Sequence, residues 1–178
     1  LAAFGEVDEA LDTIITKTGA TGEQADRLSQ SFKNVGSDTH LPLQTVGEAI
    51  GEVNTQFGFM DKKLEDSTNY LLQYAEINDT DVSQSAISAR QAIDAYGLEY
   101  DDLNSVLDVT TKTSQNTGQS VDDLMQKAID GAPQIKQLGL SFGEGVTLLG
   151  QFEQSGVDSS AALSSLSKAT VAYAKDGK

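Results

Sequence analysis

Glycine recurs along this chain at intervals that match one short helix plus a turn. Eight glycines close successive helical patterns at spacings of about 17 to 22 residues, and a turn at Asn78–Asp81 fills the one double gap. They are Gly19, Gly36, Gly58, Gly97, Gly118, Gly139, Gly156 and Gly177. Glycine suits a helix end because it adopts the left-handed conformation of a C-terminal cap without strain. This spacing permits only short helices, each of which turns back along the one before it.

Apolar residues between these stops follow helical spacing, and strand-like alternation never persists beyond a few residues. The stretch from Gly97 to Leu140 shows the unit best, as two amphipathic helices that are each closed by a glycine. We therefore expect an all-α fold of about eight to nine short antiparallel helices, arranged as consecutive αα-hairpins in one domain over residues 1–178. The pattern leaves a compact bundle and a short solenoid as alternatives.

Polar residues at the predicted helix starts indicate caps. Capping patterns occur at Thr21–Gln24, Asp81–Gln84 and Ser141–Glu144, where a side chain accepts a hydrogen bond from a free N–H group of the first turn. Ser120 and Asp158 occupy the same position before two further helices. These residues set the expected helix boundaries.

Small and apolar residues predict how the helices pack. Gly47 and Gly51 lie four residues apart inside a helical pattern, which indicates a close approach by a second helix on that smooth face. The segment Gly131–Pro133 is expected to kink or break the helix that contains it. The last helix should turn one stripe inward, formed by Ala162, Leu163, Leu166, Ala169 and Tyr173.

Charge and composition exclude several classes of function. The chain has 178 residues and a net charge of −15, from 27 acidic and 12 basic residues. Such a surface repels phosphate backbones, so we expect no direct nucleic-acid binding by this segment. No apolar run is long enough to span a membrane. The absence of cysteine excludes disulfides and thiolate sites. The sequence begins without Met, and we expect it to be a fragment of a longer polypeptide.

Candidate chemistry is sparse. The one histidine, His40, lies in a polar turn without a nucleophile motif, and a surface role is expected for it. The segment Asp79–Arg90 starts like a calcium loop but lacks the required glycine and final glutamate. The pairs Asp101–Asp102 and Asp122–Asp123 lie in first helical turns, where the helix dipole favours acids. We predict no enzyme activity, no catalytic, cofactor-binding or metal-binding residue, and no cofactor.

Aromatic residues gather near helix ends and turns. Two interpretations are open: an anchor surface for a partner protein, or rings that fill the gaps between short helices, which we favour. The residues are Phe57, Phe59, Tyr70, Tyr74, Tyr96, Tyr100, Phe142 and Phe152.

A series of short segments, taken in order, resembles the core region of tail tape measure proteins of long-tailed bacteriophages and prophages. The segments are Ile15–Gly19, Leu28, Ser37–Thr39, Val46–Ile50, Gln56–Gly58, Ala95–Gly97, Ser114–Gly118, Ala132–Ser141 and Glu153–Asp158. No single motif is specific, and the resemblance rests on the register of glycines and caps over nearly the whole chain.

The resemblance implies a structural module with roles in tail length determination, tail assembly and DNA ejection. It implies a place in the interior of the virion tail, after assembly in the bacterial host cytoplasm, and other tail proteins as partners: the tube, the tail-assembly chaperones and the tail tip. Self-association is left open. The alternative function is a helical-repeat protein-binding scaffold unrelated to phage. A cell-wall-degrading domain is disfavoured, because peptidoglycan cleavage usually needs a cleft with paired carboxylates or a metal, and the sequence indicates neither.

Overall fold

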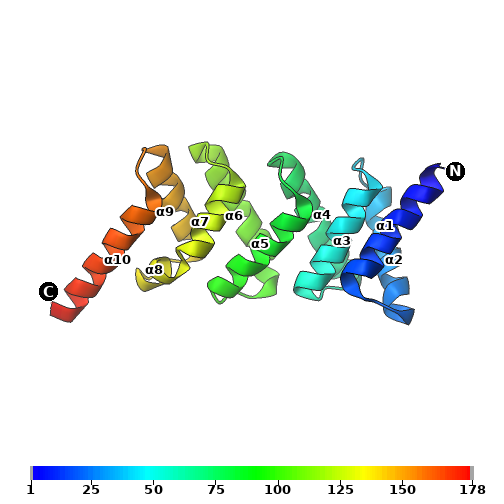
Figure 1. The fold of residues 1–178 in the computed structure, drawn as a ribbon, viewed down its shortest axis with the longest axis horizontal. Helices are drawn as coiled ribbons and strands as arrows, with labels where there is room; N and C mark the ends of the chain where they lie inside the picture. The colour runs from blue at the N-terminus through cyan, green and yellow to red at the C-terminus, as the bar shows by residue number, and fades with distance from the viewer. Residues whose placement is uncertain (1, 177–178) are drawn as a thin grey trace. The chain divides into compact units, whose positions relative to one another are not determined.

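Short helices joined by tight turns make up the chain in the computed structural model, which describes residues 2–176 (Figure 1). The helices are α1 (Ala2–Thr18), α2 (Gly22–Ser37), α3 (Leu43–Phe57), α4 (Asp61–Ile77), α5 (Val82–Ala95), the 3₁₀ turn η1 (Tyr100–Asp102), α6 (Leu103–Thr117), α7 (Val121–Asp130), α8 (Ala132–Gln137), α9 (Phe142–Gln154) and α10 (Ser159–Asp176). No strand occurs within the described residues, so the predicted all-α fold is confirmed.

The chain divides into two compact units, Leu1–Arg90 and Gln91–Lys178. The division falls within α5, and each unit has its own buried apolar residues. The single domain expected over residues 1–178 stays a prediction.

Helices of the first unit pack against the helix two positions further along as well as against their neighbours. α1 lies along α3, α2 lies along α4, and α3 also contacts α2 and α4. This arrangement stacks the hairpin α1–α2 on the hairpin α3–α4, as helical repeats do. Its largest fully buried side chains are Phe32, Ile14, Leu28, Ile50, Leu64 and Leu71.

The contact between α1 and α3 is as close as the paired glycines predicted (Figure 1). A Cβ atom at Gly47 would lie 2.9 Å from the carbonyl oxygen of Ala10 and 3.2 Å from its Cα. One turn later, a Cβ at Gly51 would lie 3.0 Å from Cδ of Lys17. The two glycines therefore let the backbone of α1 approach α3 at van der Waals distance.

The second unit repeats the alternation with a broken helix. α9 packs on α6 and α7, while α10 packs on α8 and α9. The predicted break is confirmed, because α7 ends at Asp130 and α8 begins at Ala132, with Pro133 in its first turn. At the break, a Cβ on Gly131 would lie 2.8 Å from Cδ1 of Leu163. The missing side chain thus makes room for Leu163, which α10 buries.

Most predicted caps are present. The Ser120 hydroxyl accepts from the Asp123 N–H at 3.1 Å. Ser141 and Glu144 form a reciprocal capping box, with N···O distances of 3.0 and 3.1 Å. Asp158 accepts from two N–H groups at the start of α10, and Asp81 accepts from Gln84.

The cap predicted at Thr21 is wrong, because its side chain makes no capping hydrogen bond. The chain enters α2 through Gly22 at φ 58°, whereas a capping box requires helical φ at the first helical residue. Gly36 also fails as a stop, because α2 continues to Ser37. At that position a Cβ would contact Leu43 at 3.4 Å, so the residue serves packing instead.

The inward stripe predicted for the last helix is largely wrong. Leu163 is buried, but Leu166 is 41% exposed and Tyr173 is 69% exposed. Ala169 is exposed too, while Ser167 is buried and hydrogen bonds to Gln137. α8 and α9 cover the side of α10 that carries Leu163 and Ser167, which leaves the Leu166 side open.

Candidate functional site

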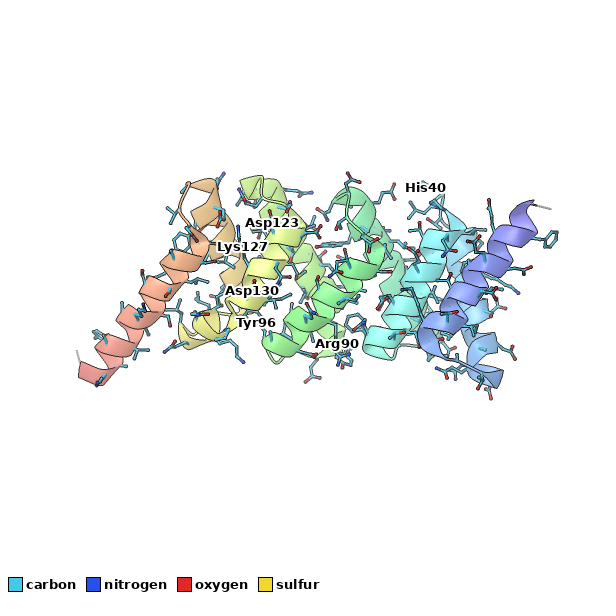
Figure 2. All side chains as sticks on the ribbon, viewed as in Figure 1. His40, Arg90, Tyr96, Asp123, Lys127 and Asp130 are labelled. Atoms are coloured by element: carbon cyan, nitrogen blue, oxygen red, sulfur yellow. The ribbon has the colours of Figure 1, made fainter. Side chains whose placement is uncertain are left out.

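His40 lies in the turn between α2 and α3, with its side chain in solvent (Figure 2). Its Nε2 is 2.9 Å from a carboxylate oxygen of Glu76 at the end of α4. This contact becomes an ion pair when the imidazole is protonated. It links α4 to the turn after α2, and the exposed position that the sequence predicted is confirmed.

Acidic residues gather around a cavity of about 310 Å³ next to this turn. Glu48, Glu76, Asp79 and Asp81 contribute to its lining, and its apolar lining residues are Leu41, Leu72, Ala75 and Val82. Asp81 uses its carboxylate to cap α5, as expected of an aspartate-rich turn. Within residues 2–176 no group of three or more histidine or acidic residues could hold a metal ion.

The aspartate pairs Asp101–Asp102 and Asp122–Asp123 lie at helix starts, where Asp102 and Asp123 take part in local hydrogen bonds. Asp102 accepts a hydrogen bond from the Glu99 N–H, and Asp123 donates its own N–H to Ser120. Neither arrangement pairs two carboxylates across a cleft, which general acid–base catalysis of glycoside hydrolysis requires. That the chain contains no catalytic residue stays a prediction.

Polar pairs one hairpin apart join the helices of the first unit. Lys17 Nζ lies 2.9 Å from Glu52, whose side chain is largely buried between α1 and α3. Arg27 forms a two-point ion pair with Asp61, and its hydrogen bonds lower the pKa of that exposed carboxyl. Ser31 donates to Glu65 in the next turn of the same two helices. Sequence analysis missed these pairs, although Lys17–Glu52 and Arg27–Asp61 place opposite charges 35 and 34 residues apart.

Glu153 joins three helices of the second unit. Its Oε1 accepts from the Ser159 N–H at 3.1 Å and from the Ser159 hydroxyl at 2.6 Å. The same oxygen lies 3.2 Å from Nζ of Lys127, which Figure 2 shows on α7 between Asp123 and Asp130. The Ser159 hydrogen bonds, followed by Lys127, lower the pKa of Glu153. This carboxylate therefore fixes the start of α10 against α7 and α9.

A shallow apolar groove of about 590 Å³ runs between α6 and α9. The apolar side chains of Val109, Leu140 and Leu148 line it. Gly143 also lines it and contributes no side chain. One adjoining hollow includes Leu98, and another includes Lys112 on α6. Half-buried aliphatic side chains with few charges suit the apolar face of a partner helix or an extended peptide.

The aromatic residues fill gaps between helices, as we favoured. Phe57 stacks on Phe59 with ring centroids 5.5 Å apart, and Tyr96 meets Phe142 edge-on at 5.3 Å. The Tyr96 hydroxyl also donates to the Ala128 carbonyl at 2.7 Å, and burial raises the pKa of this tyrosine. None of the eight aromatic side chains in question is fully exposed.

In the described part of the chain, no helix has the length and apolarity needed to cross a membrane. The sites reported above thus consist of polar links between helices and one apolar groove. The polar links join neighbouring helices within each unit.

Comparison with known proteins identifies the chain. The family model for phage-related minor tail proteins matches residues 22–178. The tape measure protein of Pneumococcus phage Dp-1 is 24% identical over 160 residues, which cover 90% of this chain and 14% of that protein. The chain thus spans about 14% of the length of this curated relative. No solved structure matches it significantly. With the family matched over most of its length, this chain belongs to the phage-related minor tail proteins, structural components of phage tails, and is related to tape measure proteins.

Proposed function

We propose that this chain is a folded helical module of a tape measure protein that takes part in tail assembly, tail length determination and DNA ejection. The observation that carries the proposal is the match of 90% of the chain to the Dp-1 tape measure protein. The module resides in the tail interior after assembly in the host cytoplasm. Its partners are the tube, the tail-assembly chaperones or the tail tip.

The folded hairpins favour a docking role for this segment over a measuring role. A stretched helix lengthens by about 1.5 Å per residue, so 178 residues would extend over roughly 270 Å. The longest helix in the described residues has 18 residues, and each α-helix before it is followed by a further helix that packs within the same fold. We propose that the measuring length of the parent protein lies in helical sequence outside this segment.

Tail length in assembled phage tests the proposal. A duplicated copy of residues 1–178, inserted in frame into the parent gene, keeps one intact module while adding 178 residues. We expect tails of unchanged length by electron microscopy, because a folded module adds no span. Tails longer by about 270 Å would show that the segment is stretched and measures length. Small-angle scattering of the isolated chain gives a second readout, since a rod of that length would contradict a folded module.

The groove between α6 and α9 supports a protein-binding scaffold as a second function. Its apolar lining by Val109, Leu140 and Leu148 provides the surface for a partner. This scaffold would act within the phage tail, since family membership removes the alternative unrelated to phage. Calorimetric titration of the chain with purified tube, chaperone and tip proteins tests it. Leu148→Asp should weaken binding of the true partner at least about tenfold, because a charge enters an apolar contact.

We also propose that the chain has no enzyme activity and does not bind nucleic acid directly. The acidic composition and the helix-capping role of the Asp81 carboxylate support it. A zymogram on host cell walls should show no clearing by the purified chain, and a mobility-shift assay should show no retarded DNA.

A further inference from the structure

The groove between α6 and α9 differs from a similar seam in the first unit. There, α2 and α4 also lie side by side one hairpin apart, and Arg27 pairs with Asp61 across their contact. Between α6 and α9, the aliphatic side chains of Val109 and Leu148 line the middle of the groove. A seam that an ion pair bridges in one unit is therefore lined by apolar side chains in the other.

The groove is long enough for a helix of about four turns. Three adjoining hollows share Val109 and together extend along α6 from Asp102 to Asn116. A helix rises by about 1.5 Å per residue, so this stretch measures about 20 Å. Gly143 adds no side chain to the lining, which leaves space for a large apolar side chain of a partner.

The groove fits a helix better than an extended peptide. The Thr147 hydroxyl donates to the Gly143 carbonyl at 2.8 Å, and the Thr117 hydroxyl donates to the Thr113 carbonyl at 2.7 Å, so both hydroxyl hydrogens are used within their own helices. The described residues contain no strand whose edge could pair with an extended chain. The N–H and C=O groups that an extended peptide turned toward this wall would lack partners, whereas a helix satisfies its own backbone.

Charges along the groove favour a basic partner. Asp102 and Glu144 line it at the end where α6 and α9 begin, and Lys112 lies near the opposite end. Hydrogen bonds from Ser141 lower the pKa of Glu144, so this carboxylate is ionised at neutral pH. A basic group at that end of a partner therefore meets two carboxylates, in a chain whose net charge of −15 also attracts it.

We propose that the groove binds an amphipathic helix of another protein, which carries large apolar residues on one face and lysine or arginine at one end. An apolar side chain of this helix packs on Val109 and Leu148 above Gly143. Its basic residues lie next to Asp102 and Glu144. This inference rests on the proposed scaffold function and specifies the kind of partner that the scaffold takes.

Binding of synthetic peptides to the 178-residue chain tests the inference by calorimetry. The probe is an amphipathic peptide of about 15 residues with leucines on one face and lysines at one end. We expect it to bind at least about tenfold more tightly than the same peptide with glutamates in place of the lysines. Its helical circular dichroism should increase on binding, and a central proline should abolish binding because it breaks the helix.

A blocking variant places the peptide in the groove. Gly143→Leu puts a side chain into the groove, and its Cβ meets Val109 at an ordinary distance of 3.5 Å, so the helices keep their packing. We expect binding of the lysine peptide to weaken at least about tenfold. Gly5→Leu on α1, where nothing lies within 4 Å, is the matched control and should leave binding unchanged.

Neutral variants test the charges. Asp102→Asn combined with Glu144→Gln removes both charges, while the new amide oxygens can still accept the capping hydrogen bonds. Binding of the lysine peptide should weaken by about tenfold and should become less sensitive to salt. Asp8→Asn combined with Asp12→Asn removes two exposed charges from α1 and should have little effect on binding.

The outcomes separate this inference from the scaffold function. If a tail protein binds the chain and loses affinity for the Gly143→Leu variant while the lysine peptide does not bind, the scaffold function stands and the basic helix is the wrong partner. Equal binding of the lysine and glutamate peptides, or retained binding of the proline peptide, would also overturn the inference. Peptide binding that survives Gly143→Leu, in a variant that circular dichroism shows to be folded, would exclude the groove as the site.

Discussion

The contact between α1 and α3 and the contact between α6 and α9 both use glycines, but the glycines face different atoms. Gly47 on α3 faces the backbone of Ala10. A Cβ atom at Gly150 on α9 would instead lie 2.6 Å from the methyl group of Thr113 and 3.2 Å from that of Thr117. A backbone in a helix cannot move without moving the helix, while a threonine side chain can rotate or be replaced. The first contact is therefore rigid and the second is adjustable.

The largest expected effect is at Gly47. Gly47→Ala puts a Cβ 2.9 Å from the Ala10 carbonyl oxygen and should separate α1 from α3, which lowers the free energy of unfolding by about 2–3 kcal/mol. Urea unfolding followed by circular dichroism measures it. Gly5→Ala on α1, where nothing lies within 4 Å, is the control and should gain up to about 1 kcal/mol from helix propensity. If Gly47→Ala left the free energy of unfolding unchanged, the α1–α3 contact would be as adjustable as the α6–α9 contact.

Gly150→Ala should cost less, about 1 kcal/mol, because the Thr113 side chain can adjust and alanine favours the helix. Thr113→Ser removes the methyl group that the new Cβ would meet. A double-mutant cycle should therefore give a favourable coupling of about 1 kcal/mol between the two substitutions. Additive effects would show that the backbone of α6, and not the Thr113 methyl group, resists the added Cβ, as the backbone of α1 does in the α1–α3 contact.

Acid should act on the second unit through Glu153. Hydrogen bonds from Ser159 hold the pKa of Glu153 in the folded state below its usual value. The ionised carboxylate therefore stabilises the folded state at pH values above the pKa that Glu153 has in the unfolded state. That contribution is lost as the pH falls through the folded pKa. Glu153→Gln should reduce stability by about 1 kcal/mol near neutral pH and should make little difference near pH 3. Urea unfolding of both proteins across this range tests the pH dependence, and a constant difference would assign the effect to something other than ionisation.

The smallest effect is expected at the exposed ion pair between α2 and α4. Asp61→Asn removes the charge that faces Arg27 but tolerates the φ of 54° at this position. Exposed pairs contribute little because solvent screens them. The urea midpoint should therefore stay within experimental error of the parent protein. A clearly lower midpoint would show that exposed polar pairs, and not the glycine contact alone, stabilise the first unit.

Local features of the sequence predicted much of the fold. Ser120 and the pair Ser141–Glu144 cap their helices as expected, because capping depends on residues a few positions apart. The close approach at Gly47 was also predictable, since a glycine inside a helix needs a packing reason. Thr21 failed because Gly22 redirects the backbone at the start of α2.

Features that depend on distant neighbours were not predictable. The periodic stripe of α10 shows which residues share a face, but not whether a second helix covers that face. The pairing of Lys17 with Glu52 required knowledge that α1 lies along α3. The groove between α6 and α9 likewise depends on which helices lie side by side. A search for opposite charges at the repeat distance would have found the ion pairs.

That repeat distance constrains how a chain of this kind changes length. Lys17–Glu52, Arg27–Asp61 and His40–Glu76 are separated by 35, 34 and 36 residues, so each pair spans one hairpin. Gain or loss of a complete hairpin leaves each remaining helix packed against an equivalent helix of the next hairpin. A change of half that size would instead place inner-facing positions toward water. Genetic variation in such a segment should therefore proceed in steps of one hairpin.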